Sequence, residues 1–143
     1  MKKRGIVLAV ALVAVVALVT GCGKKETLTC KQTASGVDIT FNIGFNGNTI
    51  TTMDFAYDMD LSGYGDTTIK YLEKQDWCST VKSSMSEYKD AFTDCKSEIK
   101  DKKLNVSSTL NVDKIAKSVL GKMKSSKAAK KELEAEGYTC TIK

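Results

Sequence analysis

The residues of this 143-residue chain with the most useful chemistry are five cysteines and scattered carboxylates, because the sequence contains no histidine. Histidine is the commonest general base and the commonest metal ligand in proteins, so Ser-His-Asp and Cys-His nucleophilic sites are excluded. A tetrahedral zinc site would need cysteines alone, and none of their spacings is C-x-x-C. A redox protein of the usual cysteine-pair type is therefore not expected.

Cys22 has the sequence context of a cysteine at the end of an export signal. It follows a basic start at residues 2–4, an apolar run over residues 6–19, and the small residues Thr20 and Gly21. A charged segment, an apolar segment and small residues before a cleavage point are typical of a secretory signal peptide. The apolar run has 14 residues, and crossing a bilayer takes about 20. A permanent transmembrane helix is therefore disfavoured.

The tetrapeptide Val-Thr-Gly-Cys over residues 19–22 resembles a bacterial lipobox. This resemblance implies that the Cys22 thiol receives a diacylglyceryl group and that signal peptidase II cuts before it. The alternatives are a signal peptidase I substrate with an incidental thiol at Cys22, or an uncleaved anchor. We expect a signal peptide over 1–21, a lipidated tether over 22–26, and a single domain over 27–143. The domain is then held on the extracytoplasmic face of the cell membrane.

The four other cysteines are expected to form two disulfides, because an exported chain with an even number of cysteines is typical of a disulfide framework. Free buried thiols are the alternative. These cysteines are Cys30, Cys78, Cys95 and Cys140. A continuous helix between Cys78 and Cys95 would separate them by roughly 25 Å, whereas a disulfide needs Cα atoms within about 7 Å. The expected pairings are therefore 30–78 with 95–140, or 30–95 with 78–140.

One acidic segment has the spacing of a calcium-binding loop. Asp58, Asp60, Ser62 and Asp66 occupy the ligand positions at the start of an EF-hand loop. The glutamate that closes such a loop is replaced by Ile69, so affinity for calcium should be poor. A turn that contains aspartate and glycine explains the same residues. We therefore expect no metal site, with these residues as a weak candidate.

The alternative function from another class is a carboxylate-based hydrolase. Its candidate residues are Asp54, Asp58, Asp60 and Asp66. Nothing in the sequence separates the pKa values of any pair among them, as acid–base catalysis requires. We therefore expect a non-enzymatic binding or envelope-associated module without a cofactor other than the lipid on Cys22. The protein or small-molecule partner is not identified by the sequence.

The charge of the chain gives no signal for nucleic-acid binding. Three of the 22 basic residues lie in the predicted signal peptide, so 19 lysines face 17 acidic residues in the rest. A net charge of about +2 is too small to indicate a nucleic-acid partner. Lysines over residues 122–131 predict a solvated helix, or contact with anionic lipid headgroups. Tyr57, Tyr64 and Tyr71 are expected in structural packing, with a pocket lining as the alternative.

The hydrophobic pattern predicts an α+β fold with helices packed on an antiparallel sheet. Apolar residues alternate over 37–43 and 49–59, and Asn46-Gly47 between them is a strong hairpin signal. Together with a strand that begins near Leu28, these segments predict a three-stranded meander. A helix over 76–92 carries one apolar stripe, which should pack on the sheet. Further strands are expected over 95–100, 104–112 and 138–142, and a further helix over 126–136.

The layout of the chain after Cys22 resembles small bacterial lipoproteins of the YehR-like group, a family of unknown function. The similar features are the lipobox, the hairpin over 37–59, Tyr88-Lys89 near the end of the central helix, the strand over 104–112 followed by Asp113-Lys114, and Glu136-Gly137-Tyr138 at the end of the last helix. The four cysteines after the lipobox depart from the pattern of enterobacterial members. The resemblance implies a lipid-anchored domain and transfers no catalytic residue.

Overall fold

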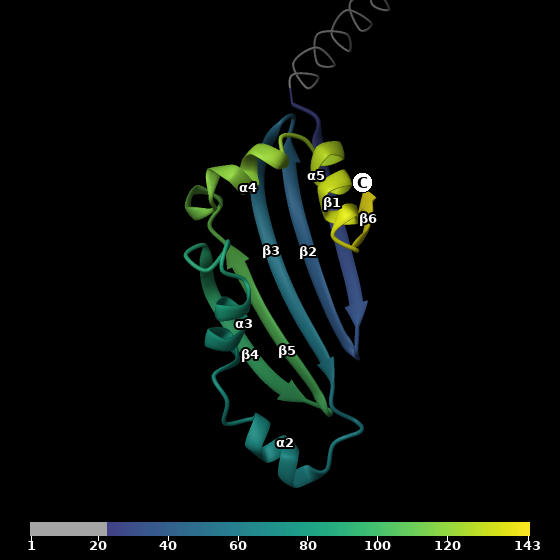
Figure 1. Cartoon of the computed structure of the whole chain (residues 1–143), viewed down its shortest axis with the longest axis vertical. Helices are drawn as coiled ribbons and strands as arrows, with labels where there is room; N and C mark the ends of the chain where they lie inside the picture. Colours follow the sequence, from purple (N-terminus) through teal and green to yellow (C-terminus); the bar gives the residue numbers. More distant parts are fainter. Residues whose placement is uncertain (1–22) are drawn as a thin grey trace, which may run out of the picture.

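The computed structural model describes residues 23–143, so Cys22 and the predicted signal peptide lie outside the described residues. The described chain forms a six-stranded antiparallel sheet in the order β4-β5-β3-β2-β1-β6 (Figure 1). Helices pack against this sheet, which confirms the predicted α+β class. The strands are β1 (Lys25–Ala34), β2 (Val37–Asn46), β3 (Thr49–Asp60), β4 (Phe92–Lys100), β5 (Lys103–Leu110) and β6 (Thr139–Ile142). The helices are α2 (Asp66–Leu72), α3 (Trp77–Ser84), α4 (Lys117–Lys122) and α5 (Ser126–Ala135), with a 3-10 turn η1 (Val112–Lys114).

Strands β1, β2 and β3 form the predicted meander. The turn between β1 and β2 places Ser35 at φ 54° and Gly36 at φ 78°, and two positive φ values are typical of a two-residue hairpin turn that matches the strand twist. The next hairpin is present as predicted, but its two-residue loop is Gly47-Asn48, with Gly47 at φ 61° and Asn46 still paired with Thr49. β1 begins at Lys25, inside the segment expected to be a tether, and the Gly47 amide donates to the Lys24 carbonyl at 2.9 Å.

The predicted helix over 76–92 is wrong in its second half. The helix α3 begins after Asp76, whose carboxylate accepts a hydrogen bond from the Ser79 amide at 3.0 Å, but it ends at Ser84. Ser83 and Ser84 near its end donate side-chain hydrogen bonds to backbone carbonyls, and serine in such positions competes with helix continuation. The chain then reverses, and Phe92 begins β4, which pairs with β5.

This reversal corrects the disulfide prediction. Cys78 and Cys95 are bonded to each other, with their Cα atoms 6.0 Å apart. Cys78 lies in the first turn of α3, and Cys95 lies at a bulge between Thr93 and Lys96 in β4. Because β4 runs back beside the short helix, the 25 Å separation expected from a continuous helix does not arise. Both predicted pairings are therefore wrong.

The second disulfide joins the first and last strands. Cys30 of β1 lies directly opposite Cys140 of β6, and their Cα atoms are 4.1 Å apart. The neighbouring pair Thr27 and Lys143 exchanges both backbone hydrogen bonds, at 2.8 and 2.9 Å. Cys30 and Cys140 therefore occupy a non-hydrogen-bonded pair, where facing side chains lie closest. The presence of two disulfides is as predicted, and only their connectivity differs.

The last helix and strand follow from local signals. Ser125 precedes α5, and its hydroxyl accepts a hydrogen bond from the Ala128 amide at 3.1 Å, which is an N-cap interaction. Ala129 and Leu133 on α5 are buried against the sheet. Gly137 follows the helix at φ 99°, a conformation that favours glycine at a helix end. Residues 139–142 then pair with β1 at the edge of the sheet.

The sheet has one covered face and one open face. On the covered face, aromatic rings form a continuous chain, with centroid separations of 5.8 Å for Tyr138–Phe41, 5.4 Å for Phe41–Phe55 and 5.6 Å for Phe55–Phe92. Alternate residues of the same strands face the other way and are polar, among them Thr29, Asn42, Asp54, Asp58, Asn105 and Thr109. Helices α3, α4 and α5 lie on the covered face (Figure 1). Among residues 23–143, no helix is long and apolar enough to span a membrane.

Candidate functional site

Two of the four candidate aspartates lie on the open face of the sheet. The Thr109 hydroxyl donates to Asp54 Oδ1 at 3.1 Å, and Asn105 Nδ2 donates to Asp58 Oδ1 at 2.7 Å. A depression of about 340 Å³ beside Asp54 also includes Asp94 and Lys96. The depression therefore contains only one of the four aspartates predicted for a hydrolase. The second carboxylate there belongs to Asp94, which was not among the predicted residues.

Of the other two candidate aspartates, Asp60 is the last residue of β3 and Asp66 lies beyond it. The Ser62 amide donates to Asp60 Oδ1 at 2.9 Å, and this hydrogen bond holds the pKa of Asp60 below its ordinary value. Asp66 begins α2 and lies 3.9 Å from the Lys102 ammonium group. Across residues 23–143, no three side chains of the histidine, cysteine, aspartate or glutamate type form a group that could hold a metal ion. The structure does not bring the three aspartates of the calcium candidate together.

The three candidate tyrosines differ in burial. Tyr57 lies on the covered face of β3, where burial is the main cause of its raised pKa and Tyr64 is the second. Tyr64 and Tyr71 are 42% and 64% exposed. Tyr57 therefore packs against the core, as predicted, whereas the prediction of structural packing is wrong for Tyr64 and Tyr71. The other two lie at the end of the molecule that carries α2 (Figure 1).

The lysine cluster over 122–131 is divided between two short helices. Lys122 ends α4 and pairs with Glu132 at 3.1 Å, whereas Lys130 pairs with Glu134 of its own helix at 3.8 Å. Lys124 and Lys127 lie near the start of α5. The cluster is thus not one helix face, and its members have different surroundings.

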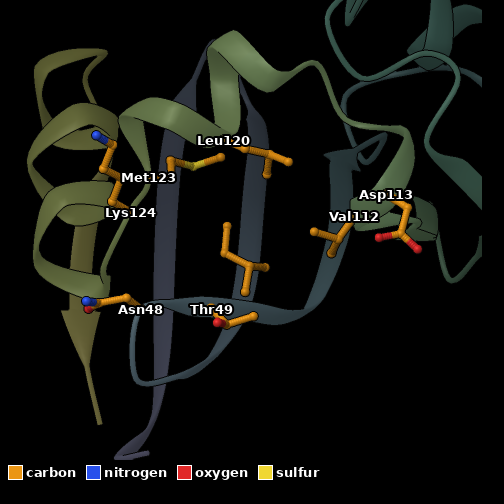
Figure 2. Close-up of a pocket in the computed structure, with 8 residues that line it drawn as sticks. Asn48, Thr49, Val112, Asp113, Leu120, Met123 and Lys124 are labelled. Atoms are coloured by element: carbon orange, nitrogen blue, oxygen red, sulfur yellow. The ribbon is translucent and has the colours of Figure 1, made fainter.

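We call the end of the molecule where the described chain begins the anchor end. It comprises Gly23–Lys25, the turn over 46–49, and residues 117–127 (Figure 1). A cleft of about 490 Å³ lies here, lined by Asn48, Thr49, Ile50, Val112, Asp113, Leu120, Met123 and Lys124. In Figure 2 the side chains of Val112, Leu120 and Met123 point toward the cleft, whereas the Asp113 carboxylate points away.

A carboxylate ties the first strand to α5 at the anchor end. The buried Ser126 hydroxyl donates a hydrogen bond to Glu26 Oε2, and the Lys24 ammonium group lies 3.2 Å from Oε1. The hydrogen bond from Ser126 is the largest cause of the lowered pKa of Glu26, followed by that from Lys24. The ionised form of Glu26 is therefore favoured in the folded state.

Because the pKa of Glu26 is lower in the folded than in the unfolded chain, its charged form stabilises the fold above its unfolded pKa of about 4.3. This stabilisation is lost as pH falls through the folded pKa. We expect Glu26→Gln to lower the free energy of unfolding near neutral pH and to have a much smaller effect near pH 2. Urea unfolding over a pH series measures this difference. Glu98→Gln, at an exposed position of β4, is the control, and parallel pH profiles for wild type and Glu26→Gln would contradict the expectation.

A second concave surface lies on the covered face, in the interval between α3 and α5. We call it the acid–aromatic groove and define it by Phe41, Glu87, Tyr88, Lys122, Glu132, Leu133, Glu136 and Tyr138. It comprises two adjoining hollows of about 280 and 290 Å³ that share Glu87, Tyr88, Leu133 and Glu136. Tyr88 and Tyr138 both pack on Phe41, with ring centroids 5.9 and 5.8 Å away. Aromatic rings thus form the floor, and charged side chains form the rim.

The pKa values of the two groove tyrosines reflect this rim. Burial, with Glu136 and Glu87 as further causes, raises the pKa of Tyr88 to about 12. Burial is also the main cause of the raised pKa of Tyr138, and Glu136 adds to it. Negative charge disfavours a second negative charge on a phenol nearby. The groove is therefore a partly buried site of negative electrostatic character.

The sequence did not point to this groove. Tyr88 was assigned to the apolar stripe of a helix, whereas it lies in the turn after α3. Glu132 and Glu136 fall in the helix predicted over 126–136, and nothing in the sequence singles out Glu87. The nearest signal was the pair of tyrosines at Tyr88 and Tyr138, each close to a glutamate in sequence. Their proximity depends on the reversal at residues 85–91 and on the pairing of β6 with β1.

Comparison with solved structures finds two similar folds of low sequence identity. The NMR structure of the YehR protein from E. coli is 15% identical, with 83% of this chain and 92% of that chain covered and a TM-score of 0.49. The NMR structure of a protein from Streptococcus pneumoniae TIGR4 is 12% identical, with 82% and 86% covered and a TM-score of 0.48. No family model and no curated protein matches the chain. Membership of the YehR-like lipoproteins therefore stays a prediction.

Proposed function

We propose that this protein is a lipid-anchored, extracytoplasmic binding module of the YehR-like lipoprotein type, without enzymatic activity. A diacylglyceryl group on Cys22 attaches it to the cell membrane, and the folded domain carries the binding surface. The observation that carries the proposal is the context of Cys22: an export signal whose last residues resemble a lipobox. The two disulfides support it, because disulfides persist in exported proteins.

The position of the first strand supports a close approach to the membrane. β1 begins at Lys25, and three residues of extended chain from Cys22 span at most about 11 Å. A domain on so short a tether faces the membrane with the anchor end.

The composition of the anchor end is compatible with an anionic membrane surface. Lys24, Lys25, Lys117, Lys122, Lys124 and Lys127 belong to it and are exposed, and they outnumber its acidic residues. Each lysine near an anionic surface contributes about 1 kcal/mol of attraction. A single acyl chain binds membranes weakly, so a diacyl group with a basic surface is a stable combination.

The experiment that tests this proposal is the fractionation of Cys22→Ala in cells. We expect the wild-type protein in the membrane fraction, with a mass that includes the diacylglyceryl group. Cys22→Ala should move to unprocessed precursor or to soluble material, because the thiol that receives the lipid is absent. Thr20→Ser, which keeps a small residue before the cleavage point, is the matched control and should be processed normally. Unchanged fractionation of Cys22→Ala with normal processing would overturn the lipoprotein assignment.

A further inference from the structure

We propose that the acid–aromatic groove binds a small organic cation through an ammonium group on a short alkyl stem. This deepens the proposed binding role by assigning a ligand class to a particular surface. It does not depend on the anchor, because none of the groove residues belongs to the lipid attachment segment. Three features of the groove carry the inference: its size, its charge and its aromatic floor.

The size of the groove fits a small ligand. Its two hollows of about 280 and 290 Å³ share four lining residues, so they form one continuous surface. Pockets for drug-sized ligands have volumes of roughly 300 to 1,000 Å³. An ammonium group with a few carbon atoms matches the lower end of this range. The apolar side chain of Leu133, which lines both hollows, provides a contact for the alkyl part.

The charge of the groove favours a cation. Three carboxylates, Glu87, Glu132 and Glu136, line it together with one ammonium group, Lys122. Lys122 pairs with Glu132 at 3.1 Å, and within residues 23–143 no ion pair joins Glu87 or Glu136 to a basic side chain. The rim therefore already holds one alkyl ammonium group, that of Lys122. The carboxylates of Glu87 and Glu136 remain for the ammonium group of a ligand.

The side chain of Lys122 indicates how such a cation is stabilised. Its pKa is raised mainly by the hydrogen bond and the charge of Glu132, with further contributions from Glu87 and Glu136. The same three carboxylates therefore act together on an ammonium group at this position. A ligand ammonium between Glu87 and Glu136 would experience the same charges.

The aromatic floor supplies the second attractive interaction. Tyr88 and Tyr138 are half-buried and are held by their contacts with Phe41. A cation within about 6 Å of such a ring is attracted by the ring quadrupole. Phe41 is buried in the covered face and contacts both tyrosine rings, so we expect that little ordering of the floor is needed on binding.

The test is a titration of the mature lipidated protein, purified in an uncharged maltoside detergent, with choline chloride and separately with putrescine. Chemical shifts of the Tyr88 and Tyr138 ring protons, or calorimetry, report binding at constant ionic strength. We expect saturable binding of one or both amines. Preference for choline would indicate a quaternary ammonium ligand, and preference for putrescine a primary amine. The double variant Glu87→Gln/Glu136→Gln should weaken binding about tenfold or more, because both unpaired carboxylates are removed.

Matched variants distinguish binding in the groove from nonspecific attraction of a cation by negative charge. Glu134→Gln alters a neighbouring glutamate of α5 that pairs with Lys130 and does not line the groove; it should change the affinity by less than about twofold. Tyr88→Phe keeps the ring and should retain binding, whereas Tyr88→Leu should lose several-fold in affinity. Circular dichroism confirms that each variant is folded. Absence of saturable binding of both amines, or equal weakening by Glu134→Gln and by the double variant, would overturn the proposal. Neither result would alter the Cys22 fractionation, so the two proposals fail separately.

Discussion

Removal of the Cys30–Cys140 disulfide by the double substitution Cys30→Ala/Cys140→Ala is expected to lower the free energy of unfolding by about 4 to 5 kcal/mol. The cross-link joins residues separated by 110 positions, and closure of so long a loop removes much entropy from the unfolded chain. The Cys78–Cys95 disulfide spans 17 positions, so Cys78→Ala/Cys95→Ala should have a smaller effect of about 3 kcal/mol. Urea unfolding followed by circular dichroism measures both.

Both double variants remove two cysteines and one disulfide bond, so a difference between their losses of stability reflects the length of the loop that each disulfide closes. Proteolysis without reduction, followed by mass analysis, identifies the joined peptides independently. We expect one cross-link between the peptides of Cys30 and Cys140 and one between those of Cys78 and Cys95. Detection of Cys30–Cys78 or Cys30–Cys95 peptides would contradict the structure and restore the pairings predicted from the sequence.

Phe41→Ala is expected to destabilise the fold by about 3 to 5 kcal/mol, the range for removal of a buried phenylalanine ring. Phe41 is 4% exposed, and its ring contacts those of Phe55, Tyr88 and Tyr138. Its loss removes apolar burial, leaves a cavity in the middle of the covered face, and removes three aromatic pairs at once. Denaturant unfolding near neutral pH measures the change.

Tyr71→Ala is the control for this substitution. It removes a ring of similar size from a position that is 64% exposed, and surface substitutions of this kind change stability by about 0.5 kcal/mol or less. Phe41→Leu keeps most of the buried volume and should have an intermediate effect. A loss of less than about 1 kcal/mol in Phe41→Ala would show that the aromatic chain is not the centre of the core.

The meander of β1, β2 and β3 was predictable from the sequence because its signals are local. Alternation of apolar residues specifies which side of a strand is buried, and Asn-Gly specifies a tight hairpin. The end of α3 was not predictable from periodicity, because the apolar stripe continues through Tyr88 and Phe92 although the helix does not. A helix that continued to Phe92 would remove Phe92 from its pairing with Leu110 of β5. Tertiary contacts therefore overrode the local pattern.

In the candidate site, too, local sequence signals did not predict which residues meet. The aspartates singled out by spacing are separate in the structure, each with its own partner. The groove instead combines Phe41 with residues of the turn after α3, of α4, of α5 and of the segment before β6. These residues are up to 97 positions apart in the chain, so no spacing rule connects them. They meet because the short helix, the reversed chain and the final strand converge on one face.

The sequence by itself determined the α+β class and the presence of two disulfides, and it predicts export to the cell membrane, because each depends on residue types or on short-range periodicity. The tertiary structure alone decided which cysteines are joined and where charge and aromatic surface come together. The physical reason is that both depend on how far the chain runs before it reverses. A helix that ends at Ser84 rather than Phe92 brings Cys78 to Cys95, and it places Tyr88 beside Tyr138, Glu132 and Glu136.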